Sequence, residues 1–275
     1  MHRNLVSDIH LHSSFSGDSD TPMEEMILSG IQKGLRQMCF TEHLDMDYPY
    51  HPEDFVDFSL DVDQYEKDFL ELKHKYQGQI ELLFGIELGL QPHLYDSCQE
   101  LLHRHSFDFV IGSSHTAYGE DPYYSDCFFR GKTEQEAYHQ YFESILENLN
   151  IFADLIDTYG HIDYVVRYGP NRNLNYSYET YRDILDPILH TLIEKKVALE
   201  VNTGGLKYGL GHPNPCEEII QKYYEFGGRL ITIGSDAHSP EYLAYEFPKI
   251  EKMLKEFGFT HYSIFRQREP VLLPL

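Results

Sequence analysis

The sequence has few positively charged residues and no long apolar segment. Lys and Arg number 22 against 45 Asp and Glu, which gives a formal net charge of −23. Nucleic-acid binding depends on Lys and Arg that neutralise phosphates, and an anionic membrane surface would also repel so acidic a chain. We therefore expect a small molecule as the partner, with no nucleic acid and no membrane.

Cysteines are also few, and none of the four belongs to a Cys-x-x-Cys pair. Cys39 lies in the apolar run Met38-Cys39-Phe40, where a buried reduced thiol is expected rather than a disulfide. The first residues, MHRNLVSDIHLH, lack the apolar core of a signal peptide, and no stretch approaches the roughly 18 apolar residues that cross a membrane. The prediction is a cytoplasmic protein that is a monomer or a small homo-oligomer.

Short apolar runs alternate with longer amphipathic segments throughout the sequence. The expected strands span residues 5–9, 37–41, 80–86, 107–112, 164–166, 197–201 and 230–233, with a further short one at 261–265. The expected helices span residues 22–34, 61–76, 92–105, 133–157, 178–195, 215–226 and 240–257, the first with Thr21 as its N-cap. This alternation favours a parallel sheet, and closure would remove its edges. We predict an α/β fold, a distorted (β/α)7 barrel with residues 1–275 as a single domain, over an open doubly wound sheet.

Residues that commonly bind metals stand where the predicted strands end. They are His10, His12, Asp18, His43, Glu87, His115, His161, Asp236 and His238, with His161 just before the predicted fifth strand. Catalytic groups of barrels gather at the carboxyl ends of the strands. In an extended segment the two rings of His10 and His12 point to the same side. Nine ligands suit three metals, and mixed His and carboxylate ligands do not select among Zn, Mn and Fe. Glu87 is placed to bridge two of them.

With these residues in place, the sequence resembles the polymerase-and-histidinol-phosphatase (PHP) family, most closely its bacterial histidinol-phosphate phosphatases. The resemblance extends over nearly the whole chain, through Asp8-x-His-x-His, Thr41-Glu42-His43, Gly85-Ile86-Glu87, Ser114-His115, Gly160-His161 and Ser235-Asp236-Ala237-His238. It implies a distorted (β/α)7 barrel with a trinuclear metal centre. The implied ligand sets are, first, His10, His12, Glu87 and Asp236; second, Glu87, His115 and His161; third, Asp18, His43 and His238.

The resemblance also places basic groups around the phosphate. Arg167 matches one such position, whereas Lys207 stands where close relatives are expected to have Arg. Because Lys cannot make the bidentate contact that Arg makes with phosphate, Lys207 either holds the phosphate less rigidly or does not contact it.

The expected reaction is attack by a metal-bridging hydroxide on the phosphorus of a small-molecule phosphate monoester. The sequence has no G-x-S-x-G, Walker A or Cys-x5-Arg motif that would indicate another route. A metal-bound water, Asp236 or His238 could protonate the leaving alkoxide.

The substrate is the less specific part of the prediction. Glu42, Asp45 and Asp47 are candidates for contact with the cationic end of histidinol phosphate, although an acidic solvated loop would contain the same residues. Residues 116–132 could close over the site, which favours a small molecule. The alternatives are a phosphotyrosine phosphatase or nuclease with the same metal centre, and a noncatalytic metal-binding module, which would lack some of the ligands.

Overall fold

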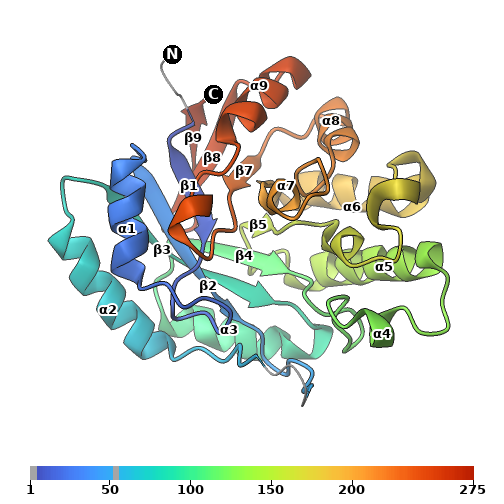
Figure 1. Cartoon of the computed structure of the whole chain (residues 1–275), viewed down its shortest axis with the longest axis horizontal. Helices are drawn as coiled ribbons and strands as arrows, with labels where there is room; N and C mark the ends of the chain where they lie inside the picture. The colour runs from blue at the N-terminus through green and yellow to red at the C-terminus, as the bar shows by residue number, and fades with distance from the viewer. Residues whose placement is uncertain (1–4, 52–55) are drawn as a thin grey trace.

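The protein is represented by a computed structural model that describes residues 5–51 and 56–275. The strands are β1 Ser7–Leu11, β2 Gln37–Leu44, β3 Glu81–Gly89, β4 Phe109–Ser113, β5 Thr158–Tyr159, β6 Ala198–Asn202, β7 Ile231–Gly234, β8 His261–Arg266 and β9 Glu269–Pro274. The α-helices are α1 Met23–Gln32, α2 Val62–Lys75, α3 Tyr95–Arg104, α4 Ser125–Phe128, α5 Glu134–Phe152, α6 Arg182–Lys195, α7 Gly204–Lys207, α8 Glu217–Glu225 and α9 Phe247–Phe257. The longer helices surround a central sheet (Figure 1). No helix of the described residues is long and apolar enough to span a bilayer.

The central sheet confirms the predicted barrel. Strands β1 to β7 are parallel and follow one another in chain order. The ends of the sheet meet where Asp236 N donates to His10 O at 2.8 Å and His12 N donates to Ala237 O at 2.9 Å. These bonds nearly close the barrel and bring the ligand-type residues that follow β7 beside those of β1.

The strands and helices form where the sequence patterns predict them, with shifts at their ends. Almost every residue of the barrel strands is buried, as expected for strands covered on both faces. Thr133 caps α5 through a reciprocal capping box with Glu136. Thr21, by contrast, does not cap α1, which follows Pro22. Its hydroxyl donates instead to the carbonyl of His238 at 3.1 Å, so it connects the β1 loop to the β7 loop.

The fifth strand lies elsewhere than the sequence pattern suggests. It is the two-residue β5, and Tyr164–Arg167 forms a 3₁₀ turn, η2. The apolar run at 164–166 is buried within this turn, and a short apolar run does not distinguish a strand from a buried turn. His161 therefore follows the fifth strand instead of preceding it, which places it at the same end of the barrel as the other ligand-type residues.

The expected strand at 261–265 exists but lies outside the barrel. It forms β8, which pairs antiparallel with β9. Arg266 binds Glu81 at the start of β3 with Nε 2.6 Å from Oε1, and Arg268 Nε lies 2.5 Å from Asp157 Oδ2, just before β5. The hairpin thus covers the amino ends of the strands, and the carboxyl ends remain available for a site.

Candidate metal centre

All nine ligand-type residues predicted from the sequence lie at the carboxyl ends of the barrel strands. His10 belongs to β1, His43 to β2 and Glu87 to β3, and the remaining six lie on the segments that follow β1, β4, β5 and β7. His10, His12 and Glu87 have no exposed surface, and His43, His115, His161 and Asp236 are also buried. The structure therefore gathers them into one cluster at one end of the barrel.

Glu87 is at the centre of the cluster, and its two carboxylate oxygens face different histidines. Oε2 lies 3.0 Å from His10 Nε2 and 3.5 Å from His12 Nε2. Oε1 lies 3.2 Å from His115 Nε2 and 3.0 Å from His161 Nε2. A carboxylate in this position can bind one cation with each oxygen, as the sequence analysis predicts.

Three of the histidine rings are held at one nitrogen and directed by the other toward Glu87. His10 Nδ1 lies 2.5 Å from Glu200 Oε1, and His115 Nδ1 lies 2.7 Å from Asp45 Oδ1. His12 Nδ1 lies 3.1 Å from the hydroxyl of Ser16. Metal-binding histidines are generally held in this way, because a hydrogen bond at one ring nitrogen fixes the tautomer and leaves the other free to coordinate.

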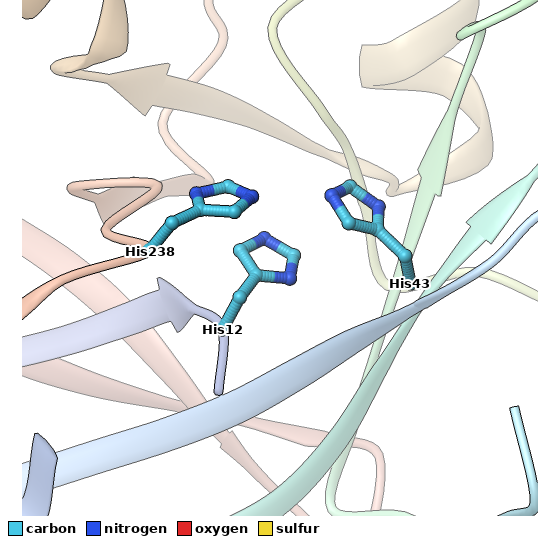
Figure 2. Close-up of side chains that lie close together, drawn as sticks. All are labelled: His12, His43 and His238. Carbon is cyan, nitrogen blue, oxygen red and sulfur yellow. The ribbon is translucent and has the colours of Figure 1, made fainter. Parts of the chain in front are cut away.

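A second group of side chains lies nearer the surface. His238 Nε2 lies 3.0 Å from Asp18 Oδ2, and His43 Nε2 lies 3.7 Å from the same oxygen. The rings of His12 and His43 are stacked with centroids 4.1 Å apart, and those of His12 and His238 with centroids 4.3 Å apart. Figure 2 shows these three rings directed toward a common space. His12 thus connects the inner group around Glu87 to the outer group with Asp18.

The backbone at two of the ligand-type positions is strained. His161 has φ of 22° and Asp236 has φ of 55°, values that non-glycine residues seldom adopt. Such strain is retained at functional sites when the surroundings hold it. Asp8 supplies part of that support after β7, because it accepts hydrogen bonds from the backbone and the hydroxyl of Ser235 at 2.9 and 2.6 Å.

Burial and the closeness of the side chains to one another shift the pKa values of the cluster. Burial by itself would lower the pKa of His10, but the carboxylates of Glu200 and Glu87 raise that pKa well above its ordinary value. Burial would raise the pKa of Glu87, but nearby histidines, above all His10 and His115, lower it well below its ordinary value. Burial lowers the pKa of His12 well below its ordinary value. Glu87 is therefore ionised and His12 neutral, which are the protonation states that metals need, whereas His10 would release a proton when a metal binds.

The donor atoms fit divalent metals. Four groups of three ligand-type residues each have donor atoms within 4.8 Å of one another. His10, His12, His43 and Glu87 each belong to two of these groups. His12 Nε2 and His43 Nδ1 are buried without a hydrogen-bond partner among the described residues, although buried polar atoms are normally satisfied. Coordination to a cation would satisfy both nitrogens.

A pocket of about 190 Å³ opens beside this cluster. Its lining includes the ligand-type residues Asp18, His43, His115, His161, Asp236 and His238. Arg167 also lines it, and its side chain is buried with Nε and Nη2 free of hydrogen bonds within the described chain. The guanidinium lies 4.0 Å from the centre of the Tyr208 ring, which holds it in place. Two unpaired guanidinium donors beside a metal-type cluster suit a phosphate group.

Lys207 is less well placed than Arg167. Its ammonium lies 4.5 Å from the centre of the Tyr242 ring and 5.0 Å from that of Tyr208, and it does not belong to the pocket lining. Burial lowers the pKa of His238, Asp18 raises it above the ordinary value, and the charge of Lys207 opposes that rise. Lys207 therefore influences the site electrostatically from its edge.

The three acidic residues proposed for the cationic end of a substrate have different surroundings. Glu42 is fully buried and binds the hydroxyls of Ser13 and Ser16 at 2.5 and 2.6 Å. It lies outside the pocket because neighbouring strand residues point to opposite sides. Asp47 is exposed and lies 3.0 Å from His93, also outside the pocket. Only Asp45 lines the pocket, and one of its oxygens is bound to His115.

Sequence reasoning missed two carboxylates of the site. Glu200 fixes His10 and also accepts from the backbone of His161 at 2.8 Å. The signal in the sequence that could have identified Glu200 is its position near the end of the strand predicted at 197–201. Asp121 lines the pocket and is only 3% exposed. It lies in the middle of a loop, where no spacing or strand end distinguishes it from solvated acidic residues.

The comparison with known families agrees with this geometry. The model of the PHP domain matches residues 8–204. The chain belongs to the PHP family. The match runs from β1 to the start of α7 and includes seven of the nine ligand-type residues, while Asp236 and His238 lie beyond it.

Relatives of this PHP chain are similar over nearly their whole lengths. A probable histidinol-phosphatase of Clostridium acetobutylicum is 32% identical over 252 residues, which cover 90% of this chain and 92% of the relative. A histidinol-phosphatase of Lactococcus lactis subsp. lactis is 30% identical, with 94% and 93% covered. A crystal structure of histidinol phosphate phosphatase from Lactococcus lactis subsp. lactis, complexed with zinc, L-histidinol and phosphate, superimposes with a TM-score of 0.86. It is 29% identical and covers 96% of this chain and 98% of that one.

Proposed function

We propose that the protein is a histidinol-phosphatase, a metal-dependent hydrolase that converts L-histidinol phosphate to L-histidinol and phosphate in histidine biosynthesis. The observation that supports this most directly is the pocket in which Arg167 and the His and carboxylate cluster share one lining. The relatives with this activity match the chain over nearly its full length, and the Lactococcus structure with zinc, L-histidinol and phosphate shares its fold.

The ligand-type residues group into three proposed metal positions. The first would use His10, His12, Glu87 and Asp236; the second Glu87, His115 and His161; the third Asp18, His43 and His238. The two oxygens of Glu87 divide between the first two sets, and Asp18 lies near both imidazoles of the third. Divalent metals bound there would supply a hydroxide at neutral pH and neutralise the charge of the phosphoryl group. Zn, Mn and Fe all suit such ligands.

The side chains of the pocket would orient the phosphate and complete proton transfer. Arg167 would donate from Nε and Nη2 to phosphoryl oxygens and stabilise charge that develops on them. Lys207 would add a more distant positive charge. When the bond between phosphorus and the ester oxygen breaks, the leaving alkoxide needs a proton. Asp236 and His238, which both line the pocket, are the protein groups placed to deliver it.

A small substrate suits the site better than a macromolecule. The pocket is small, and Tyr123 and Tyr124 of the loop 116–132 belong to its wall. Because the formal net charge of the protein is −23, we propose that it has neither a nucleic-acid partner nor a membrane partner. We also propose that it acts in the cytoplasm as one domain.

A comparison of substrates tests the proposed function. The metal-replete protein would be assayed for phosphate release from histidinol phosphate, phosphotyrosine, p-nitrophenyl phosphate and a short oligonucleotide. We expect histidinol phosphate to lead in kcat/KM by orders of magnitude. If phosphotyrosine or the oligonucleotide leads, the metal centre stands and the substrate assignment is wrong.

A further inference from the structure

Asp121 is a buried carboxylate in the pocket wall that the proposed chemistry does not use. It belongs to the segment between β4 and α4. It is in none of the groups of ligand-type residues that could share a metal within the described part of the chain. Its Oδ2 accepts from the Tyr48 hydroxyl at 2.5 Å, and its Oδ1 accepts from the backbone of Tyr123 at 2.7 Å. A third, longer hydrogen bond comes from the Tyr164 hydroxyl, 3.5 Å from Oδ1. All three donors are neutral, and the carboxylate can accept about four hydrogen bonds. Capacity therefore remains for a ligand.

The charge of Asp121 has no ion-pair partner among the described residues. Burial raises its pKa to about 6, although the hydrogen bonds from Tyr48 and Tyr123 and the charge of His115 act in the opposite direction. A buried carboxylate without a paired cation is destabilising. Retention of such a group at the wall of a pocket is typical of a binding residue.

Tyr164 separates Asp121 from the metal-type cluster. The Tyr164 ring lies 5.8 Å from that of His115 and 5.3 Å from that of His161, measured between centroids. Its hydroxyl lies 3.5 Å from Asp121 Oδ1. Asp121 is therefore one tyrosine away from the proposed position of the phosphate. A small molecule in this pocket can contact both places at once.

The surroundings of Asp121 suit a flat or cationic nitrogen group. Tyr48, Phe58, Tyr124 and Tyr164 line the same pocket. Aromatic faces attract ammonium and imidazolium groups, and a carboxylate accepts their N–H donors. At the other side of the pocket, the carboxylates belong to the metal-type cluster, and the Tyr208 ring lies against the cationic Arg167.

We propose that Asp121 binds the positively charged, nitrogen-bearing end of the substrate and so sets specificity among phosphate monoesters. This inference rests on the proposed function and deepens it. The phosphate would lie against the proposed metal positions and Arg167, and the amine or the imidazole of histidinol phosphate would donate to Asp121 between the tyrosine rings. Asp121 thus takes the role that the sequence analysis gave to Glu42, Asp45 and Asp47.

The test compares Asp121→Asn with two matched variants. Asp121→Asn removes the charge and keeps the shape. Tyr48→Phe removes the hydrogen bond between the two loops and keeps the charge. Asp126→Asn makes the same charge change at an exposed residue nearby that does not line the pocket. Each variant is assayed on histidinol phosphate, its N-acetyl derivative and p-nitrophenyl phosphate.

Asp121→Asn should lower kcat/KM for histidinol phosphate by about 10- to 100-fold, mainly through KM, because a charge-assisted hydrogen bond is lost. Turnover of p-nitrophenyl phosphate, which has no cationic end, should change little. Asp121→Asn should also bind L-histidinol more weakly than the wild type, as measured by titration calorimetry. Asp126→Asn should match the wild type. Tyr48→Phe should affect histidinol phosphate and p-nitrophenyl phosphate alike.

The N-acetyl derivative distinguishes the two nitrogen groups. If Asp121→Asn removes the wild-type preference for histidinol phosphate over that derivative, the carboxylate binds the amine. An equal loss on both compounds assigns it to the imidazole. Equal losses on histidinol phosphate and p-nitrophenyl phosphate, or no loss on either, would overturn the assignment. If the proposed function itself is wrong, the wild type will show no preference for histidinol phosphate over the other substrates. That result would also refute the assignment of Asp121.

Discussion

The carboxylate of Asp45 lies 2.7 Å from Nδ1 of His115, and the other nitrogen of that ring faces Glu87 at 3.2 Å. Asp45 therefore orients His115, a candidate metal ligand, although it follows directly after β2 and also lines the pocket. The same relationship joins Glu200 to His10. These carboxylates orient the imidazoles and raise their basicity toward a metal.

Asp45→Asn should weaken metal binding by about 10- to 100-fold, because a neutral amide supports the imidazole of His115 less well than a carboxylate. The measurement is metal content after dialysis against buffered metal, combined with kcat. Asp47→Asn is the matched control, since Asp47 belongs to the same segment but is exposed and outside the pocket. Equal metal content in the two variants and the wild type would show that Asp45 has no such role.

Glu87→Gln should reduce kcat by at least about 100-fold, in the range found when a group that stabilises developing charge is removed. The amide keeps the shape of the side chain but cannot offer two anionic oxygens to two cations. Metal analysis should show loss of more than one ion per chain. Glu81→Gln, on the same strand but at the hairpin end of the barrel, should retain full metal content and activity. Near-wild-type turnover of Glu87→Gln with full metal content would refute the bridging role.

Arg167→Lys should lower kcat/KM by about 100-fold or more, because Lys cannot make the bidentate contact with phosphate. Lys207→Ala should lower it less, since Lys207 lies at the edge of the site over the Tyr242 ring. Inhibition by inorganic phosphate depends on the same contacts. It should weaken more in Arg167→Lys than in Lys207→Ala. A larger effect of Lys207→Ala would mean that Lys207 is the principal phosphate contact.

Removal of the metals by a chelator should abolish phosphate release and lower the melting temperature. A ligand present at about 1,000 times its Kd stabilises the folded state by about 4 kcal/mol. Without cations, buried imidazole nitrogens of His12 and His43 have no hydrogen-bond partner among the described residues. Differential scanning calorimetry before and after chelation, followed by addition of Zn, Mn or Fe, measures both effects. An unchanged melting temperature would mean that the cluster does not hold metals.

Much of the site follows from local sequence patterns. Each of the segments Thr41-Glu42-His43 and Gly85-Ile86-Glu87 ends an apolar run, and strand alternation determines which side chain points inward. Parallel strands in a barrel bring their carboxyl ends together. These two rules gather most of the ligand-type residues within the barrel that the strand–helix alternation predicts. They do not place His161, because the fifth strand lies elsewhere than its apolar run suggests.

Only the tertiary structure decides which of several similar residues does what. Glu42, Asp45, Asp47 and Asp121 are all acidic residues near strand ends or in loops, yet one binds serines, one supports His115, one is solvated and one lines the pocket wall. The position of β5 and the placement of the β8–β9 hairpin outside the barrel also depend on packing, because short apolar runs are equally compatible with strands and turns. The sequence by itself determined the chemistry of the ligands and the order of the strands. The pairing of each buried charge required the fold, since its partners come from distant parts of the chain.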